Sequence, residues 1–171
     1  MNRRDLETLL VTLESTPALL ARAARELSAD EITGRPRAGG FSFLENVWHL
    51  ADLECEGYGA RIRRILSEAE PTLSDFEGDR MARERAYQRR DLAEGLRLFA
   101  RARTANVEKL RLASMSDWRR AGFQESVGRI TLADIPKMMV HHDRSHTEEI
   151  RALLEEIRTG VAAEPHRSAV A

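Results

Sequence analysis

The chain has 171 residues, the size of one domain, which is long enough to bury a hydrophobic core without disulfides. Its 27 Lys and Arg are matched by 28 Asp and Glu, and the net charge of -1 argues against a general affinity for nucleic acid or anionic membranes. The single cysteine, Cys55, excludes an intramolecular disulfide and favours a reducing compartment. The N-terminus lacks the apolar core of a signal peptide and no apolar run could span a bilayer, so we expect a cytoplasmic protein.

Hydrophobic residues recur at helical spacing in four long segments, of which the first is residues 4–27. Pro17 falls inside this segment, where we expect a kink or a break. Glycines and a proline mark residues 28–40 as a loop. Ser42 then begins the second helix as its N-cap, and Glu45 completes a capping box three residues later.

The second helix is predicted to continue to about residue 69, and the remaining two to cover residues 80–112 and 131–158. Residues 113–129 show no regular pattern, and no stretch of useful length favours a β-strand. Four amphipathic helices in one small chain predict an all-α four-helix bundle. We assign residues 1–160 to this single metal-binding domain and residues 161–171 to a flexible C-terminal tail.

Two histidines interrupt the apolar stripe of the fourth predicted helix. His142 and His146 are four residues apart, so both rings lie on one side of a helix and can converge on one metal ion. Extending the stripe from Met139 toward Ile150 passes through both positions, which predicts that the pair faces the core. His141 is rotated away by about 100° and is the weaker candidate.

Two simpler explanations of the pair stay open, namely a solvated surface pair and buried rings that hydrogen-bond to carboxylates. The position on the apolar stripe favours metal binding over both, because buried imidazoles need polar partners. A third ligand must come from another helix, and His49 is the natural choice. The helical wheel gives it less support, since His49 lies opposite the main apolar face of the second helix. If His49 is a ligand, that helix must be contacted on two sides, or the site must lie near the surface.

The segments WHLADLE on the second helix and HHDRSHTEEI on the fourth resemble the DinB-like superfamily, including its YfiT-like members. The resemblance covers roughly residues 5–158 and implies an up-down-down-up bundle that is often a homodimer. In that family one histidine on the second helix and an HxxxH pair on the fourth bind a metal, usually zinc or nickel. Those positions correspond here to His49, His142 and His146. Some relatives are thiol-dependent transferases or isomerases, but the histidine at both pair positions matches the three-histidine branch.

Three neutral imidazoles would leave a divalent transition metal with an open position, which favours catalysis over a structural role. Such ligands suit zinc, nickel, cobalt, iron(II) or manganese. The ion could activate water for hydrolysis, or a low-molecular-weight thiol for transfer, on a small-molecule substrate. The candidate helpers are four carboxylates that could orient an imidazole or accept a proton: Glu45, Asp52, Glu54 and Glu149.

Arg144 could face an anionic substrate or be a surface charge, and Cys55 is interpreted as a small core residue outside the site. The sequence therefore predicts a metal-dependent enzyme, either a thiol-dependent S-transferase or a hydrolase. A non-enzymatic metal-binding or ligand-binding bundle is the main alternative. A structural dimer whose histidines are satisfied by carboxylates is the third possibility.

Overall fold

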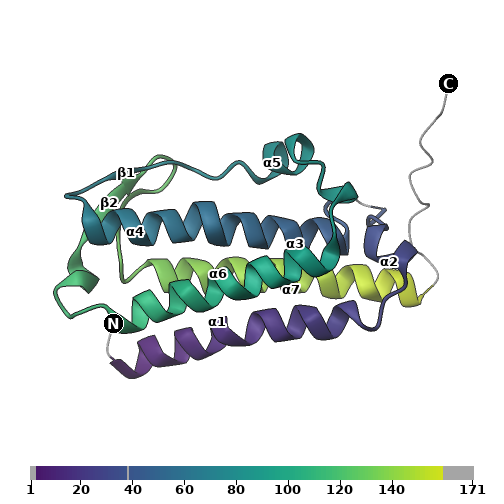
Figure 1. Cartoon of the computed structure of the whole chain (residues 1–171), viewed down its shortest axis with the longest axis horizontal. Helices are drawn as coiled ribbons and strands as arrows, with labels where there is room; N and C mark the ends of the chain where they lie inside the picture. The colour runs from purple at the N-terminus through teal and green to yellow at the C-terminus, as the bar shows by residue number, and fades with distance from the viewer. Residues whose placement is uncertain (1–2, 38, 160–171) are drawn as a thin grey trace.

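The computed structural model describes residues 3–37 and 39–159 and confirms the four-helix bundle (Figure 1). Successive legs run up, down, down and up, as the family resemblance implied. The four legs are α1 (Arg3–Ala24), α3–η1–α4 (Phe43–Asp52, Leu53–Tyr58 and Gly59–Ser67), α6 (Leu92–Leu112) and α7 (Ile135–Arg158). Both α1 and α7 run in one direction, whereas the second leg, α3–η1–α4, and α6 run in the other.

The second leg begins as predicted and then departs from a regular α-helix. The Glu45 backbone N–H donates to Ser42 Oγ over 3.2 Å, and the Ser42 backbone N–H donates to the Glu45 carboxylate over 2.9 Å, which is the expected capping box. Residues Leu53–Tyr58 form one turn of π-helix between α3 and α4. The wider turn rotates the residues after it relative to those before it, so one helical wheel cannot describe the whole leg.

The helix α1 runs without interruption from Arg3 to Ala24, so the break that was one of the two outcomes expected at Pro17 does not occur. A proline has no N–H, so the carbonyl of Leu13 loses its partner within the helix. The buried guanidinium of Arg103 on α6 donates to that carbonyl over 3.0 Å. This hydrogen bond satisfies the free carbonyl, so the helix can accommodate the proline without leaving a buried polar atom unpaired.

The prediction of one continuous third helix over residues 80–112 is wrong. The chain forms α5 (Gly78–Glu84) and a short 3-10 turn, η2 (Tyr87–Arg89), before α6 begins. Ala86 between them has a φ of 48°, a left-handed conformation that ends a helix, and the Asp91 side chain then caps α6 by accepting from the Glu94 N–H. This crossover allows α6 to run in the same direction as the second leg.

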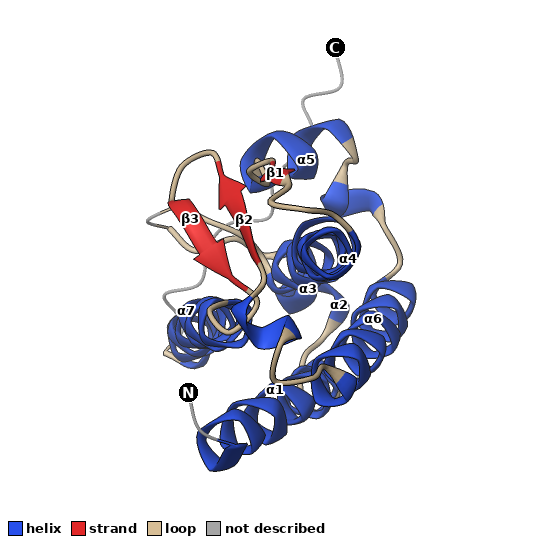
Figure 2. Ribbon diagram, turned by 90° about the vertical axis from the view of Figure 1, so that its left-hand side faces the viewer, coloured by secondary structure: helices blue, strands red, loops and turns tan. Residues whose placement is uncertain are grey.

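The expectation that the chain has no β-strand is wrong, because three short strands are present. A short helix also lies within residues 28–40, which were predicted to be a loop. The strands lie at the end of the bundle where α4 and α6 end (Figures 1 and 2). The strand β2 (Ala121–Gln124) pairs antiparallel with β3 (Gly128–Thr131) and parallel with β1 (Thr72–Leu73). The fourth helix begins only after β3, at Ile135, which is later than predicted. Periodicity could not find strands of two to four residues. The remaining elements are α2 (Ala29–Thr33), β1 (Thr72–Leu73), η3 (Asp117–Arg119), β2 (Ala121–Gln124) and β3 (Gly128–Thr131).

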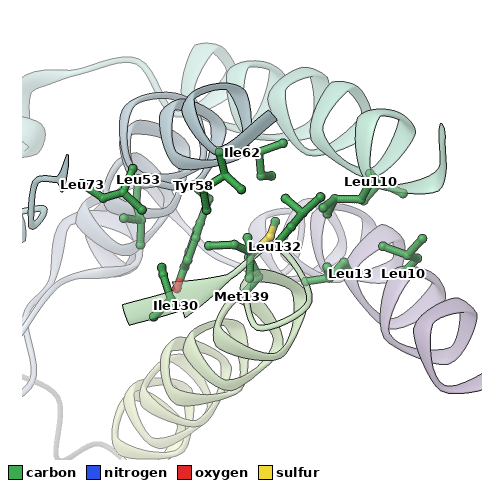
Figure 3. Close-up of a cluster of buried hydrophobic side chains, with 13 residues drawn as sticks. Leu10, Leu13, Leu53, Tyr58, Ile62, Leu73, Leu110, Ile130, Leu132 and Met139 are labelled. Atoms are coloured by element: carbon green, nitrogen blue, oxygen red, sulfur yellow. The ribbon is translucent and has the colours of Figure 1, made fainter. Parts of the chain in front are cut away.

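Two groups of buried side chains form the core, one toward each end of the bundle. The group near the sheet contains the residues drawn in Figure 3, including Leu13, Tyr58 and Met139. The other group surrounds Trp48 and Phe99. In the part of the chain that the structure describes, no helix is both long and apolar enough to cross a membrane. The predicted tail, residues 161–171, lies outside the described residues.

Candidate metal centre

The structure brings His49, His142 and His146 together between α3 and α7. Their ligand nitrogens all lie within 4.8 Å of one another. The Nε2 atom of His142 is 3.2 Å from Nε2 of His49 and 3.1 Å from Nε2 of His146. His49 and His146 are buried and His142 is partly buried, whereas His141 is exposed. The predicted group of three is therefore a cluster, and the neighbouring histidine is outside it.

His49 reaches this cluster because α3 is buried on every side. All ten residues from Phe43 to Asp52 are buried, so the face opposite the main apolar stripe is covered as well. The first residue of α5, Gly78, lies against the His49 ring, and a Cβ at that position would come within 2.5 Å of its Cε1 atom. The rings of Phe41 and Phe76 lie 5.4 Å and 5.8 Å from the same imidazole, measured between centroids. The helix that carries His49 is therefore contacted on two sides, as a metal ligand at this position requires.

The donor set fits a divalent ion. The Nδ1 atom of His146 lies 2.6 Å from Asn46 Oδ1 and 3.2 Å from a Glu149 carboxylate oxygen. Both neighbours accept hydrogen bonds, so Nδ1 carries the proton and Nε2 has a free lone pair directed at the other histidines. In the metal-free chain, Nε2 of His49 and Nε2 of His146 can at best share a single N–H on Nε2 of His142, so hydrogen bonds among the three rings satisfy them poorly. A positive ion among them would accept a lone pair from each ring.

Burial keeps the three rings in the form that binds metals. Desolvation lowers the pKa of His49 from 6.5 to about 3, with a smaller contribution from the nearby His146. Desolvation likewise lowers the pKa of His142 to about 3. It also lowers the pKa of His146, against the opposing effect of Glu149 and Asp143. All three imidazoles are therefore neutral near pH 7 and do not have to lose a proton before binding a cation.

The metal-free protein is expected to lose stability as the pH falls from 7 toward 4. The unfolded chain binds a proton on each histidine near the ordinary pKa of 6.5, whereas folded His49 and His142 bind one only near pH 3. Above pH 6.5 the two rings do not reduce the free energy of unfolding. As the pH falls from 6.5 toward 3, each ring lowers the free energy of unfolding by about 1.4 kcal/mol per pH unit. Urea unfolding at pH 7, 6 and 5 measures this loss.

Two neighbouring histidines provide the matched variants for this measurement. His142→Gln should reduce the slope of stability against pH by about one proton. His141→Gln should leave the slope unchanged, because His141 is exposed and lies outside the cluster. Equal slopes for the wild type and both variants would contradict the burial of His142.

A pocket of about 1030 Å³ opens onto the cluster, and both His49 and His146 line it. Its walls come from the loop before α3, from α5 and η2, and from the second half of α7. The charged side chains that line it are Arg35, Glu45, Asp79, Arg83, Glu149 and Glu156. The pocket is large enough for a small molecule and is lined by both apolar and charged groups.

The four predicted carboxylate helpers have different surroundings. Glu149 alone contacts a histidine of the cluster, and it also lines the pocket. Glu45 lines the pocket but is engaged by Arg35 and Gln88. Burial raises the pKa of Glu45, yet hydrogen bonds from Arg35, the Ser42 backbone and Gln88 outweigh it and leave the pKa below its ordinary value. Glu149, which contacts His146, is therefore a better candidate proton acceptor than Glu45, which is engaged by Arg35.

The other two carboxylates hold the scaffold. Asp52 accepts hydrogen bonds from Tyr87 over 2.6 Å and from Arg85 over 2.7 Å. Glu54 lies 2.9 Å from the Arg103 guanidinium, deep in the bundle. Neither residue lines the pocket.

The remaining candidates also have clear positions. Arg144 is exposed and pairs with Glu148 over 2.8 Å, so it is a surface charge. Cys55 is half-buried on η1, outside the histidine cluster.

Two contributors to the site were not predicted from the sequence. One is Asn46, which lies one helical turn before His49 and contacts His146. The other is Asp143, which lies between the paired histidines and accepts two hydrogen bonds from Arg103, over 2.6 Å and 2.8 Å. Asn46 carried a usable signal, since a position three residues before a ligand lies on the same side of a helix. The pairing of Asp143 with Arg103 depends on how α6 packs against α7.

The profile of the DinB superfamily matches residues 12–150, most of the chain. The chain therefore belongs to the DinB superfamily, as the two histidine segments suggested.

Two individual proteins extend this result. YfiT from Bacillus subtilis, described as a probable metal-dependent hydrolase with an unusual four-helix bundle topology, matches the structure with a TM-score of 0.84. The match covers 94% of this chain and 90% of that one at 22% identity, which demonstrates a shared fold. A Bacillus licheniformis protein named "Putative metal-dependent hydrolase" is 34% identical over 76 residues, which is 44% of this chain. The matched segment spans 43% of that relative, less than half its length.

Proposed function

We propose that this protein is a metal-dependent hydrolase acting on a small molecule, with His49, His142 and His146 holding the ion. The observation that carries the proposal is the convergence of three neutral Nε2 atoms at the wall of a large pocket. The descriptions of YfiT and of the Bacillus licheniformis relative support the same class of reaction.

Zinc or nickel is the ion that we propose. Imidazole nitrogens suit both metals, and both bind sites of this kind tightly. Within residues 3–37 and 39–159, the cluster offers three ligands and no fourth histidine, cysteine or carboxylate. Catalytic zinc sites have three protein ligands and leave a position for water or substrate, whereas structural sites are usually closed by four. When bound, the ion would supply positive charge that activates a water nucleophile and stabilises negative charge on the substrate.

The chain itself supplies the pocket and a proton acceptor. The two phenylalanine rings that flank His49 shield one side of the cluster from water. Glu149 has a side chain that is 52% exposed and borders the pocket, so it can accept a proton from a water molecule there. Arg35 and Glu45, which also line the pocket, neutralise each other. We propose Glu149 as the residue that holds the proton during hydrolysis.

The test begins with protein purified without a metal-affinity column and then loaded with zinc or nickel. It is assayed against chromogenic esters, amides and phosphoesters, with a parallel assay of a low-molecular-weight thiol and an electrophile. Hydrolysis that requires the metal and is lost in His146→Ala supports the proposal. Glu149→Gln should then reduce kcat by about 100-fold while the metal remains bound.

Two other outcomes would change the assignment. Turnover only in the thiol assay would replace the hydrolase with a thiol-dependent transferase on the same ion. Stoichiometric metal with no turnover in either assay, together with tight small-molecule binding, would support the non-enzymatic binding bundle.

A further inference from the structure

We propose that Asn46 is a positioning residue that fixes His146 in the Nδ1–H tautomer, so that Nε2 of this ring is always a free electron-pair donor at the cluster. The link between this tautomer and metal affinity rests on the proposed function. The tautomer itself is a property of the metal-free chain. No other residue of the cluster has its tautomer determined in this way within the described part of the structure.

The orientation of the Asn46 amide is decided by two backbone carbonyls. Its Nδ2 group donates to the carbonyl of Ser42 over 3.1 Å and to the carbonyl of Phe41 over 3.3 Å. An amide nitrogen has two protons, and both are used in these contacts. Exchanging the nitrogen and oxygen would place an acceptor against two carbonyl oxygens and lose both hydrogen bonds. The Oδ1 atom must therefore face the opposite direction.

That direction leads to His146. Oδ1 of Asn46 lies 2.6 Å from Nδ1 of the ring, and Asn46 is 1% exposed, so water does not compete for this contact. An amide oxygen can only accept, and Nδ1 must donate. A neutral imidazole has one N–H, and placing it on Nδ1 leaves Nε2 unprotonated. Nε2 is the atom that faces His142 over 3.1 Å.

The other two histidines lack such a partner. Nδ1 of His49 and Nδ1 of His142 are buried and make no hydrogen bond in the described structure. Glu149 also lies 3.2 Å from Nδ1 of His146, but its side chain is 52% exposed and its contact is longer than that of Asn46. Asn46 is therefore the main determinant, and His146 is the ring that is prepared for metal binding before the ion arrives.

Nitrogen-15 NMR of metal-free protein labelled at histidine tests this inference directly. Long-range proton–nitrogen spectra distinguish a protonated ring nitrogen from an unprotonated one, and His146→Gln identifies the His146 signals. In the wild type we expect a proton on Nδ1 and none on Nε2. A wild-type spectrum with the proton on Nε2 would overturn the proposal.

Two substitutions at Asn46 separate positioning from packing. Asn46→Leu keeps the branched shape of the side chain but removes the acceptor, and we expect His146 to lose its preference for Nδ1–H. Asn46→Asp keeps the acceptor toward Nδ1 of His146 and should keep the tautomer, although its second oxygen loses the two hydrogen bonds to the carbonyls of Ser42 and Phe41 and should lower the stability. Asn106→Leu is the matched control, because Asn106 is also a buried asparagine but contacts Glu54 instead of a histidine. Unchanged His146 signals in Asn46→Leu would also overturn the proposal.

Metal affinity gives the second measurement, by competition with a chelator. Asn46→Leu should weaken zinc binding by about 10-fold to 100-fold, as expected for loss of the hydrogen-bond partner of a metal ligand. Asn46→Asp and Asn106→Leu should remain within a few-fold of the wild type. A wild type that binds no zinc or nickel would refute the proposed function and leave the tautomer result standing. A wild type that binds metal with His146 protonated on Nε2 before loading would refute the role of Asn46 alone.

Discussion

Alanine at His142 or at His146 is expected to abolish stoichiometric metal binding and to leave the helical circular-dichroism signal largely intact. Each substitution removes one of three ligand nitrogens that lie within 4.8 Å of one another. Two remaining imidazoles bind a divalent ion far more weakly than three. Neither ring belongs to the two apolar groups of the core, so the bundle should still fold. Elemental analysis of protein purified without a metal-affinity column measures the metal content.

The control for this experiment is the exposed neighbour on the same helix. His141→Ala should retain the wild-type metal content, because its ring lies outside the cluster. Retention of a full equivalent of metal by both His142→Ala and His146→Ala would refute the assignment of the site. Loss of metal in His141→Ala would mean that the wrong member of the adjacent pair had been assigned.

Replacing Arg103 with methionine is expected to lower the free energy of unfolding by about 3–5 kcal/mol. The guanidinium is 1% exposed and pairs with two buried carboxylates, Asp143 and Glu54. Burial already raises the pKa of Glu54, and Arg103 is the main group that opposes this shift. The substitution would leave both carboxylates without their cation, and would leave the carbonyl that Pro17 exposes on α1 without its donor. Urea denaturation of metal-free protein at pH 7 measures the change.

Arg101 provides the comparison for this prediction. It lies on the same helix but is exposed, so Arg101→Met should change the stability by no more than about 0.5 kcal/mol. Combining Arg103→Met with Glu54→Gln and Asp143→Asn should recover part of the loss, because no buried charge then lacks a partner. If Arg103→Met were as stable as Arg101→Met, the buried network would not be what holds α1, α6 and α7 together.

The sequence predicted correctly the features that depend on contacts between residues close together in the chain. The capping box joins Ser42 to Glu45, three residues apart, and it formed as expected. The spacing of His142 and His146 places both rings on one side of α7 whatever lies opposite. The position of the apolar stripe on the same helix then indicated that this side faces the core.

The second leg illustrates where a regular helical wheel fails. On an unbroken α-helix, Tyr58 would lie on the side opposite His49. In the structure its ring centroid lies 6.1 Å from that of His142, in the same region as the cluster. The π-helical turn at Leu53–Tyr58 rotates the later residues toward α7. Neither this turn nor the all-round burial of α3 has a signal in hydrophobic periodicity.

The sequence by itself determined four amphipathic helices, the paired histidines and the family, because spacing along one helix and short motifs carry that information. Only the tertiary structure decided that His49 meets His142, 93 residues away, and that Arg103 reaches the carbonyl of Leu13, 90 residues away. The short strands and the break between α5 and α6 were likewise decided only by the tertiary structure. Contacts between distant residues depend on how whole helices pack, and packing is set by the combined burial of many side chains rather than by any local pattern.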